Sequence, residues 1–419
     1  MSETAAQWGL GKRLGFVFLA VYLTLVITQD LLGIIPPVGE LWLALWSALM
    51  PTLGNAVFGI ADPIQVAMTG SGDMTWDWIR TFWMLVLALV TAALVVAVDR
   101  QRTDYRGWYA GLRVLVRYAL SLVLFGYGLA KLTGNQFVPP SPLELARSYG
   151  DSSPMGLAWT FMGFSTAYCW FTGLAEILAG ALLAVRRTTT LGALLACGVM
   201  ANVVAINFCF DVPVKLYSSH LLFMAMFLVT HDARRLIDFL ILARTPAPPE
   251  VVAPPTRRMR IAGIVGRSVF VLALAGMAAM QAAAVGEITA MAVRGPLYGA
   301  WEVDALSIDG VALPPGSGER WRQVVVGEYP YMIIRPGRGE IIALGFSHDA
   351  AAGTVSLVDY RGEAPVTHVL TAELLGEQLT LRGSFAGAQL VACLRHIDTE
   401  NSLLVTRGFH WVNERPYNR

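Results

Sequence analysis

The sequence has 419 residues, of which 55% are hydrophobic and 15% charged, and its formal net charge is +1. A mean hydropathy of +0.54 excludes an ordinary water-soluble globule and indicates a polytopic membrane protein. From residue 296 onward there are 14 acidic and 10 basic residues, whereas the preceding part has 16 acidic and 21 basic. This asymmetry predicts an acidic soluble domain attached to a membrane body with basic edges.

Seven apolar runs are long enough to cross a bilayer, which takes about 20 helical residues for about 30 Å of hydrocarbon. They cover roughly residues 14–35, 77–98, 109–131, 157–185, 190–210, 217–238 and 261–292. The first run lacks a convincing cleavage site and is interpreted as a retained transmembrane helix. The apolar run 40–50 is too short for a span, and its paired tryptophans predict an interfacial or re-entrant helix.

Basic residues are concentrated in every second gap between these runs. They are Lys12 and Arg13, then Arg100, Arg102 and Arg106, then Arg186 and Arg187, then Arg234, Arg235, Arg244, Arg257, Arg258 and Arg260. Because cytoplasmic loops carry the excess of lysine and arginine, the pattern predicts a cytoplasmic N-terminus, seven spans and a periplasmic C-terminal domain. The expected location is a bacterial inner membrane.

The predicted domains follow from these runs and from a change of periodicity near residue 295. We expect an N-terminal transmembrane hairpin with an interfacial helix (1–108), a four-helix membrane core (109–243), a proline-rich cytoplasmic linker (244–260), a seventh transmembrane helix (261–294) and a periplasmic β domain (295–419). In the last domain, alternating apolar residues and regularly spaced glycines predict eight or nine short strands. This pattern is typical of an all-β small barrel or sandwich.

Two short stretches of the β domain add detail. Leu297-Tyr-Gly-Ala-Trp301 resembles the Gly-x-Trp strand of lipocalin-like barrels. In the final run, 407–419, aromatic, basic and amide side chains alternate. This run is interpreted as a closing strand and tail whose aromatics pack on the barrel's end, or else as a docking surface on the membrane body.

Ionisable residues deep in the spans are few. Arg117 and Glu176 both lie about nine residues from the predicted cytoplasmic edge, on the order of 13 Å, and Asn202 lies somewhat deeper. An unpaired charge at such depth is costly, so we expect a buried Arg117–Glu176 pair with Asn202 nearby. The pair is either structural or part of a proton or ion relay.

A second polar group is predicted at the outer ends of the core spans. Its members are Tyr127, Lys131, Asn207, Asp211, Lys215 and His220. We expect a pocket between them, walled by Phe125, Tyr127, Phe137, Phe208 and Tyr217. Titratable groups beside an apolar wall suit a quinone head group, or they form a salt-bridged rim. Ser218 or Ser219 is the expected N-cap of the sixth span.

The core spans resemble the DoxX-like family of bacterial membrane proteins. The resemblance rests on Phe125-Gly-Tyr-Gly-Leu-Ala-Lys131, on Gly173-Leu-Ala-Glu176 and on the run from Asn202 through Asn207 to Asp211. It implies a four-helix membrane unit in which a lysine ends the first helix and a glutamate lies in the second. Named members include a subunit similar to the quinone-reducing part of thiosulfate:quinone oxidoreductase. The unit more distantly resembles the membrane core of vitamin K-dependent carboxylases.

Three functions are therefore open. The chain is a redox-linked subunit that binds a quinone or similar apolar ligand, a non-catalytic accessory or assembly protein acting through its β domain, or a small-molecule or ion transporter using Arg117 and Glu176. No metal, flavin, phosphate-loop or nucleic-acid-binding motif is present in the sequence, so the quinone is the one cofactor considered. The expected partners are the lipid bilayer and a periplasmic or membrane protein. Whether the chain is an enzyme stays open.

Overall fold

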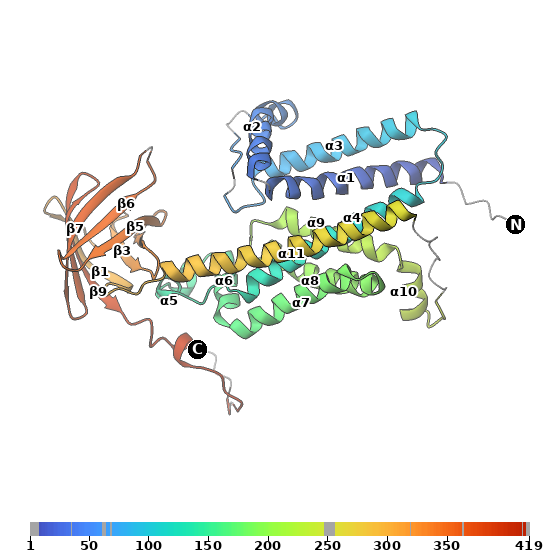
Figure 1. Cartoon of the computed structure of the whole chain (residues 1–419). Coiled ribbons are helices and arrows are strands. Elements are labelled where there is room, and N and C mark those ends of the chain that lie inside the picture. Colours follow the sequence, from blue (N-terminus) through green and yellow to red (C-terminus); the bar gives the residue numbers. More distant parts are fainter. Residues whose placement is uncertain are drawn as a thin grey trace. The chain divides into compact units, whose positions relative to one another are not determined.

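The computed structural model describes residues 8–34, 36–60, 64–67, 69–246, 256–318, 320–362, 364–412 and 414–415. The chain divides into two compact units, which are both drawn in Figure 1. The helical unit comprises Met1–Gln136 and Ala167–Gln281, and the barrel unit comprises Phe137–Thr166 and Ala282–Arg419. Residues 137–166, predicted within the 109–243 core, therefore group with the barrel. Most of the predicted 244–260 linker lies outside the described residues.

The helical unit is built from nine α-helices within the described residues. They are α1 (Leu10–Ile34), α2 (Pro36–Phe58), α3 (Thr75–Val98), α4 (Arg106–Leu132), α7 (Thr166–Ala184), α8 (Thr189–Cys209), α9 (Lys215–Thr230), α10 (Ala233–Leu240) and α11 (Arg257–Met291), which continues into the barrel unit. Seven of them, namely α1, α2, α3, α4, α7, α8 and α11, are long and apolar enough to cross a membrane. The predicted class, a polytopic helical membrane protein, is confirmed at this level.

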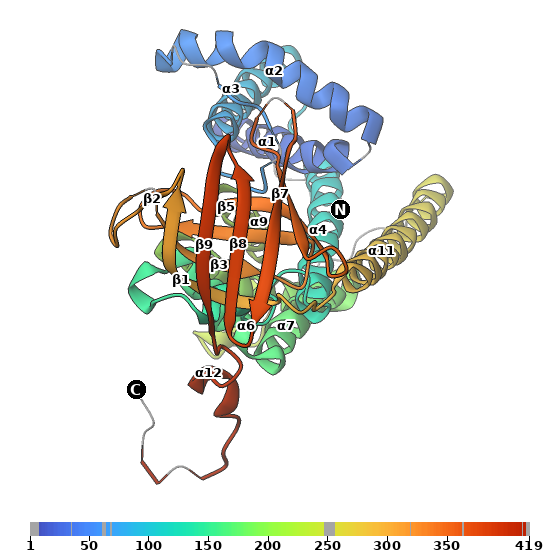
Figure 2. The same cartoon turned by 90° about the vertical axis from the view of Figure 1, so that its left-hand side faces the viewer.

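The individual spans differ from the predicted ones in three places. The helix expected over 40–50 covers Pro36–Phe58 and is itself a candidate span, so the expectation that it is too short to cross a membrane is wrong. Figures 1 and 2 show that α2 crosses α1 and α3 instead of running alongside them. The run 217–238 is interrupted, because α9 ends at Thr230 and α10 begins at Ala233. The run 157–185 is interrupted at Ser165, between α6 (Pro154–Phe164) and α7.

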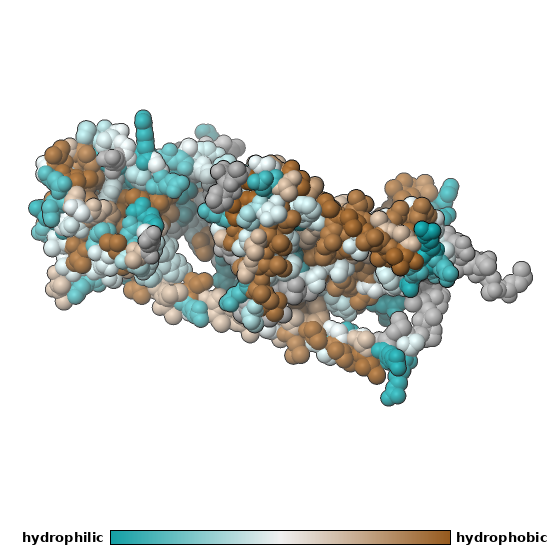
Figure 3. Space-filling view, turned by 90° about the horizontal axis from the view of Figure 1, so that it is seen from above, coloured by the Kyte–Doolittle hydropathy of each residue, from teal (hydrophilic) through white to brown (hydrophobic). Residues whose placement is uncertain are grey.

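Large apolar side chains remain exposed along the helices. On α3, for example, Leu89, Leu94 and Val98 are exposed, and the candidate span of α11 buries none of its residues. Figure 3 shows hydrophobic side chains gathered over the helices and a mixed surface over the strands. Because exposing this much apolar area to water is unfavourable, these faces suit contact with lipid.

The barrel unit contains one antiparallel sheet that closes on itself. Its strands are β1 (Gly299–Ile308), β2 (Val311–Ala312), β3 (Trp321–Val326), β4 (Tyr331–Pro336), β5 (Ile342–Asp349), β6 (Thr354–Asp359), β7 (Val366–Leu375), β8 (Gln378–Phe385) and β9 (Ala388–Ile397). Each strand from β3 to β9 pairs with the next, and β1 pairs with both β3 and β9. Eight strands therefore form a closed barrel, and β2 is a short partner of β1. Of the two β architectures predicted, the barrel is the one observed.

Alternate side chains of these strands fill the barrel. Trp301, Met332, Leu357 and Leu381 are all buried there, as is typical of small closed barrels. The Trp301 indole Nε1–H donates to the Leu297 carbonyl oxygen at 3.0 Å, which satisfies its buried donor. The β1–β2 hairpin turns at Asp309 and Gly310, whose φ values of +49° and +79° suit this Asp-Gly pair.

The turn after β6 carries a pH-dependent contact. The Arg361 side chain and backbone N–H groups donate to the Asp359 carboxylate, at 2.6 to 3.0 Å, and lower the pKa of Asp359 to about 2. Because the pKa of a free aspartate is about 3.9, the folded state gains stability above that pH and loses it as the pH falls towards 2. The gain is below about 1 kcal/mol because the pair is solvent-accessible.

We expect Asp359→Asn to remove this part of the pH dependence. Acid unfolding of the full chain, followed between pH 4 and pH 2, measures it. An Asp359 carboxyl group that titrates near 4 in the folded wild type would contradict the assignment.

Candidate functional site

A close helix crossing brings the best-defined buried charges together. On α4 and α7, Gly128 and Gly173 face each other so closely that a Cβ on Gly128 would lie 2.6 Å from the Gly173 carbonyl oxygen. Seven residues along each helix from this crossing, the Ser121 hydroxyl donates to the Gly180 carbonyl oxygen at 2.7 Å. Small residues at seven-residue spacing permit such close packing in a membrane.

Lys131 and Glu176 form an ion pair beside this crossing. The Lys131 Nζ donates to both Glu176 carboxylate oxygens, at 3.0 and 2.8 Å. The two side chains are only 7% and 4% exposed. The Lys131 ammonium also lies 5.6 Å from the centre of the Tyr127 ring. Both charges are thus compensated, and the pair fixes α4 against α7.

The predicted Arg117–Glu176 pair is wrong. The crossing sets Ser121 level with Gly180, so Arg117 lies level with the end of α7 near residue 184 and not with Glu176. Arg117 is instead near Thr189, whose hydroxyl oxygen accepts from it at 3.5 Å, and the Asn202 side chain is exposed. Arg117 and Glu176 are each about nine residues from the predicted cytoplasmic end of their helix. These two helix ends do not lie at the same depth, so the two residues do not meet.

The remaining outer residues form separate local contacts. The Asn207 side-chain amide donates to the Ser218 hydroxyl oxygen at 2.9 Å. Lys215 Nζ lies 2.8 Å from the Asp211 carboxylate, whose side chain is 83% exposed. The backbone N–H groups of Lys215 and Leu216 donate to Asp73, so Asp73 caps α9 from a distant loop. The predicted cap at Ser218 or Ser219 is therefore wrong.

His220 has two defined hydrogen-bond partners in another part of the helical unit. Its Nδ1 lies 2.7 Å from the Leu216 carbonyl oxygen, and its Nε2 lies 2.6 Å from the Tyr22 hydroxyl. Because a carbonyl oxygen accepts, Nδ1 carries a proton and donates to the Leu216 carbonyl oxygen. The His220 ring therefore links α9 to Tyr22 of α1.

The predicted outer pocket is not assembled as expected. Of its proposed walls, the rings of Tyr127 and Tyr217 lie together, with centres 6.3 Å apart. Phe208 is exposed, and Phe137 packs against Trp159 in the barrel unit. The candidate residues thus take part in four separate contacts, at Lys131–Glu176, at Asn207–Ser218, at Asp211–Lys215–Asp73 and at His220–Tyr22.

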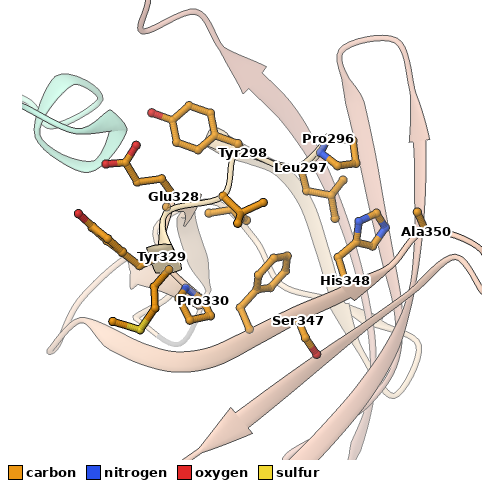
Figure 4. Close-up of a pocket in the computed structure, with 15 residues that line it drawn as sticks. Pro296, Leu297, Tyr298, Glu328, Tyr329, Pro330, Ser347, His348 and Ala350 are labelled. Atoms are coloured by element: carbon orange, nitrogen blue, oxygen red, sulfur yellow. The ribbon is translucent and has the colours of Figure 1, made fainter. Parts of the chain in front are cut away.

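A cavity of about 320 Å³ lies in the barrel unit, at the rim where the chain passes from α11 into β1. We call this the junction rim, defined by residues 291–298, 326–330 and 346–350. Its cavity is lined by Met291, Val293, Gly295, Pro296, Leu297, Tyr298, Val326, Gly327, Glu328, Tyr329, Pro330, Phe346, Ser347, His348 and Ala350. Figure 4 shows that His348 lies beside Leu297 and Pro296, whereas Tyr298 and Glu328 lie at the other side.

The walls of this cavity are apolar with a few polar groups at its edge. The Val293 backbone N–H donates to the Glu328 carbonyl oxygen at 2.6 Å, and Arg294 forms an ion pair with the Glu328 carboxylate at 3.3 Å. Burial raises the pKa of Tyr298, against the opposing effect of Arg294, so its hydroxyl stays protonated at neutral pH. The polar side chains in the lining are Tyr298, Glu328, Tyr329, Ser347 and His348.

Sequence reasoning did not find the junction rim. Its residues come from three segments that are distant in sequence, and each segment alone resembles an ordinary turn. Within the part of the chain that the structure describes, no group of three or more His, Cys, Asp or Glu side chains could hold a metal ion.

The geometry defines a class, a helical membrane protein with a closed C-terminal β-barrel. The chain belongs to the family of the uncharacterized protein YwoB of Bacillus subtilis (strain 168), with which it is 40% identical over 120 residues. These residues make up 28% of this chain and 75% of YwoB. No family model matches the chain, and no solved structure matches it.

Proposed function

We propose that this chain is a multi-pass protein of a bacterial inner membrane that binds a lipid-soluble ligand with a polar ring, a quinone or a similar molecule, at the junction rim. The proposal includes a DoxX-like core within 109–243, a cytoplasmic N-terminus and a periplasmic barrel. In this role the chain would act as a redox-linked subunit. The DoxX-like part is supported by Lys131 and Glu176, the two charges that carry the resemblance, because they form the buried pair.

The observation that carries the proposal is the position and lining of the cavity. Met291 both ends the last candidate span and lines the cavity. A ligand dissolved in the bilayer would thus meet the junction rim directly where the span ends. The volume of about 320 Å³ is at the lower end of small-molecule sites, which are about 300–1,000 Å³. A single substituted ring fits this size.

A photoreactive benzoquinone with a ten-carbon chain tests the proposal on the full chain in lipid nanodiscs. We expect labelled peptides from 291–298, 326–330 and 346–350. Ala350→Phe should fill the cavity and reduce labelling about tenfold, which corresponds to about 1.4 kcal/mol of binding. Ala352→Phe is the matched control, because Ala352 lies in the same hairpin and is also exposed but is not part of the lining.

Labelling concentrated at Lys131 or His220 would contradict binding at the junction rim and would place the ligand site in the helical unit. Equal labelling of both alanine variants would also contradict it.

An accessory or assembly role is the second candidate. It is favoured by the helical unit, where Lys131 and His220 each have an internal partner on another helix. In this case the quinone labels no defined peptide, and a cross-linker on the barrel captures one protein in fixed proportion. The transporter hypothesis loses its motivating contact, since Arg117 and Glu176 are not paired.

A further inference from the structure

The C-terminal segment, residues 398–415, exposes several large apolar side chains. After β9 the chain forms a short helix, α12 (Leu403–Thr406), and then continues without a further strand through its described residues. Trp411 is 91% exposed and Phe409 is 79% exposed. Leu403, Leu404, Val405 and Val412 are also exposed. Within residues 407–412 and 414–415 the predicted closing strand is absent, and Phe409 and Trp411 do not pack on the barrel. The other positions of the predicted run, 413 and 416–419, lie outside the described residues.

Strand register fixes where this segment leaves the barrel. Ala300 at the start of β1 is paired with Ile397 at the end of β9. The segment therefore begins at the junction rim, where the chain arrives from α11. Residues 292–298 join Met291 to Gly299, and seven residues reach at most about 25 Å. The base of the segment thus lies within a short distance of the end of a candidate membrane span.

The composition of the C-terminal segment suits the interface between membrane and water. Tryptophan is enriched where a membrane meets water, because its ring is apolar and its N–H is polar. Phe409 and Trp411 pack edge to face, with ring centres 5.1 Å apart, and form one apolar unit. Arg407 and Arg415 flank this unit, and arginine stems lie along lipid while their charged ends stay in water.

We propose that the C-terminal segment lies in the interfacial layer of the bilayer that α11 crosses, with Phe409 and Trp411 inserted among the lipids. The partner is the lipid surface, and the inference does not depend on any ligand in the cavity. The segment gives the barrel a second attachment to the membrane beside the covalent one through α11. Burying two aromatic side chains there removes apolar area from water.

Photoreactive benzoyl-phenylalanine at position 411 tests the contact in the full chain. The protein is placed in vesicles of phosphatidylcholine and phosphatidylglycerol, irradiated and analysed by mass spectrometry. We expect a lipid adduct at position 411. Position 311 is the matched control: Val311 is 67% exposed, and it pairs with Ile308 at the opposite end of β1. No lipid adduct is expected there.

A second variant measures the strength of the attachment. Phe409→Ser combined with Trp411→Ser should increase the rate of trypsin cleavage after Arg407 in vesicles by about tenfold or more, since each factor of ten corresponds to about 1.4 kcal/mol. In detergent-free vesicles the wild-type segment should stay protected. Adducts to a protein at position 411, equal lipid adducts at 411 and 311, or unchanged cleavage of the double variant would each overturn the proposal.

Discussion

Glu176→Leu is expected to lower the free energy of unfolding of the full chain by about 3–5 kcal/mol, because it leaves the Lys131 ammonium buried without its counter-charge. Lys131→Met should have a similar effect, because it leaves the Glu176 carboxylate buried without its counter-charge. The double variant Lys131→Met with Glu176→Leu should recover most of the loss, because two apolar side chains of similar length replace the whole pair. Reversible unfolding in mixed detergent micelles measures all three.

Asp211→Asn is the matched control for this prediction. The Asp211 side chain is 83% exposed, so its ion pair with Lys215 is worth about 0–1 kcal/mol, and Lys215 keeps its contacts with Asp73. Single variants at Lys131 and Glu176 that unfold like Asp211→Asn would show that the buried pair does not hold the helices. A double variant no more stable than the singles would show that their effects are unrelated.

Gly128→Ala is expected to separate α4 from α7 and destabilise the chain by about 1–3 kcal/mol, the usual cost of inserting a methyl group into a packed core. The added Cβ meets the Gly173 carbonyl oxygen and the Ile177 side chain, both at 2.6 Å. The Gly173 carbonyl oxygen is a backbone atom, so it cannot move aside through a change of side-chain rotamer. Separation of the helices also lengthens the Lys131–Glu176 contact.

Gly111→Ala provides the control within the same helix. A Cβ at Gly111 has nothing within 4 Å, so alanine should be neutral or stabilising there by up to about 1 kcal/mol. Unfolding midpoints of the two variants, measured side by side, give the comparison. Equal stabilities would contradict the close crossing.

The parts of this structure that depend on local pattern were predictable. Alternation and turn glycines predicted a small β domain, and Asp309-Gly310 forms the hairpin turn that such a pair favours. Apolar length predicted a bundle of spanning helices. The Ser141 hydroxyl caps α5 (Pro142–Leu145), and a serine followed by a proline is a local signal for such a helix start.

The contacts that depend on the register between distant segments were not predictable. Lys131 was assigned to the outer cluster and Glu176 to Arg117, because one sequence gives the depth of each residue but not the offset between two helices. The crossing at Gly128 and Gly173 sets that offset. Likewise, nothing in the sequence around Asp73 indicates that this residue caps α9 from 142 residues away.

Closure of the barrel between β1 and β9 has a consequence for biogenesis. A chain synthesised from its N-terminus presents β1 first, and β9 follows only after the other strands. Until β9 arrives, one edge of β1 has unpaired N–H and C=O groups that can recruit a foreign strand. Pairing residues as distant as Ala300 and Ile397 is slow because of the long loop that must close. Completion of this barrel is therefore a late event, and its nascent form is the stage most exposed to misassembly.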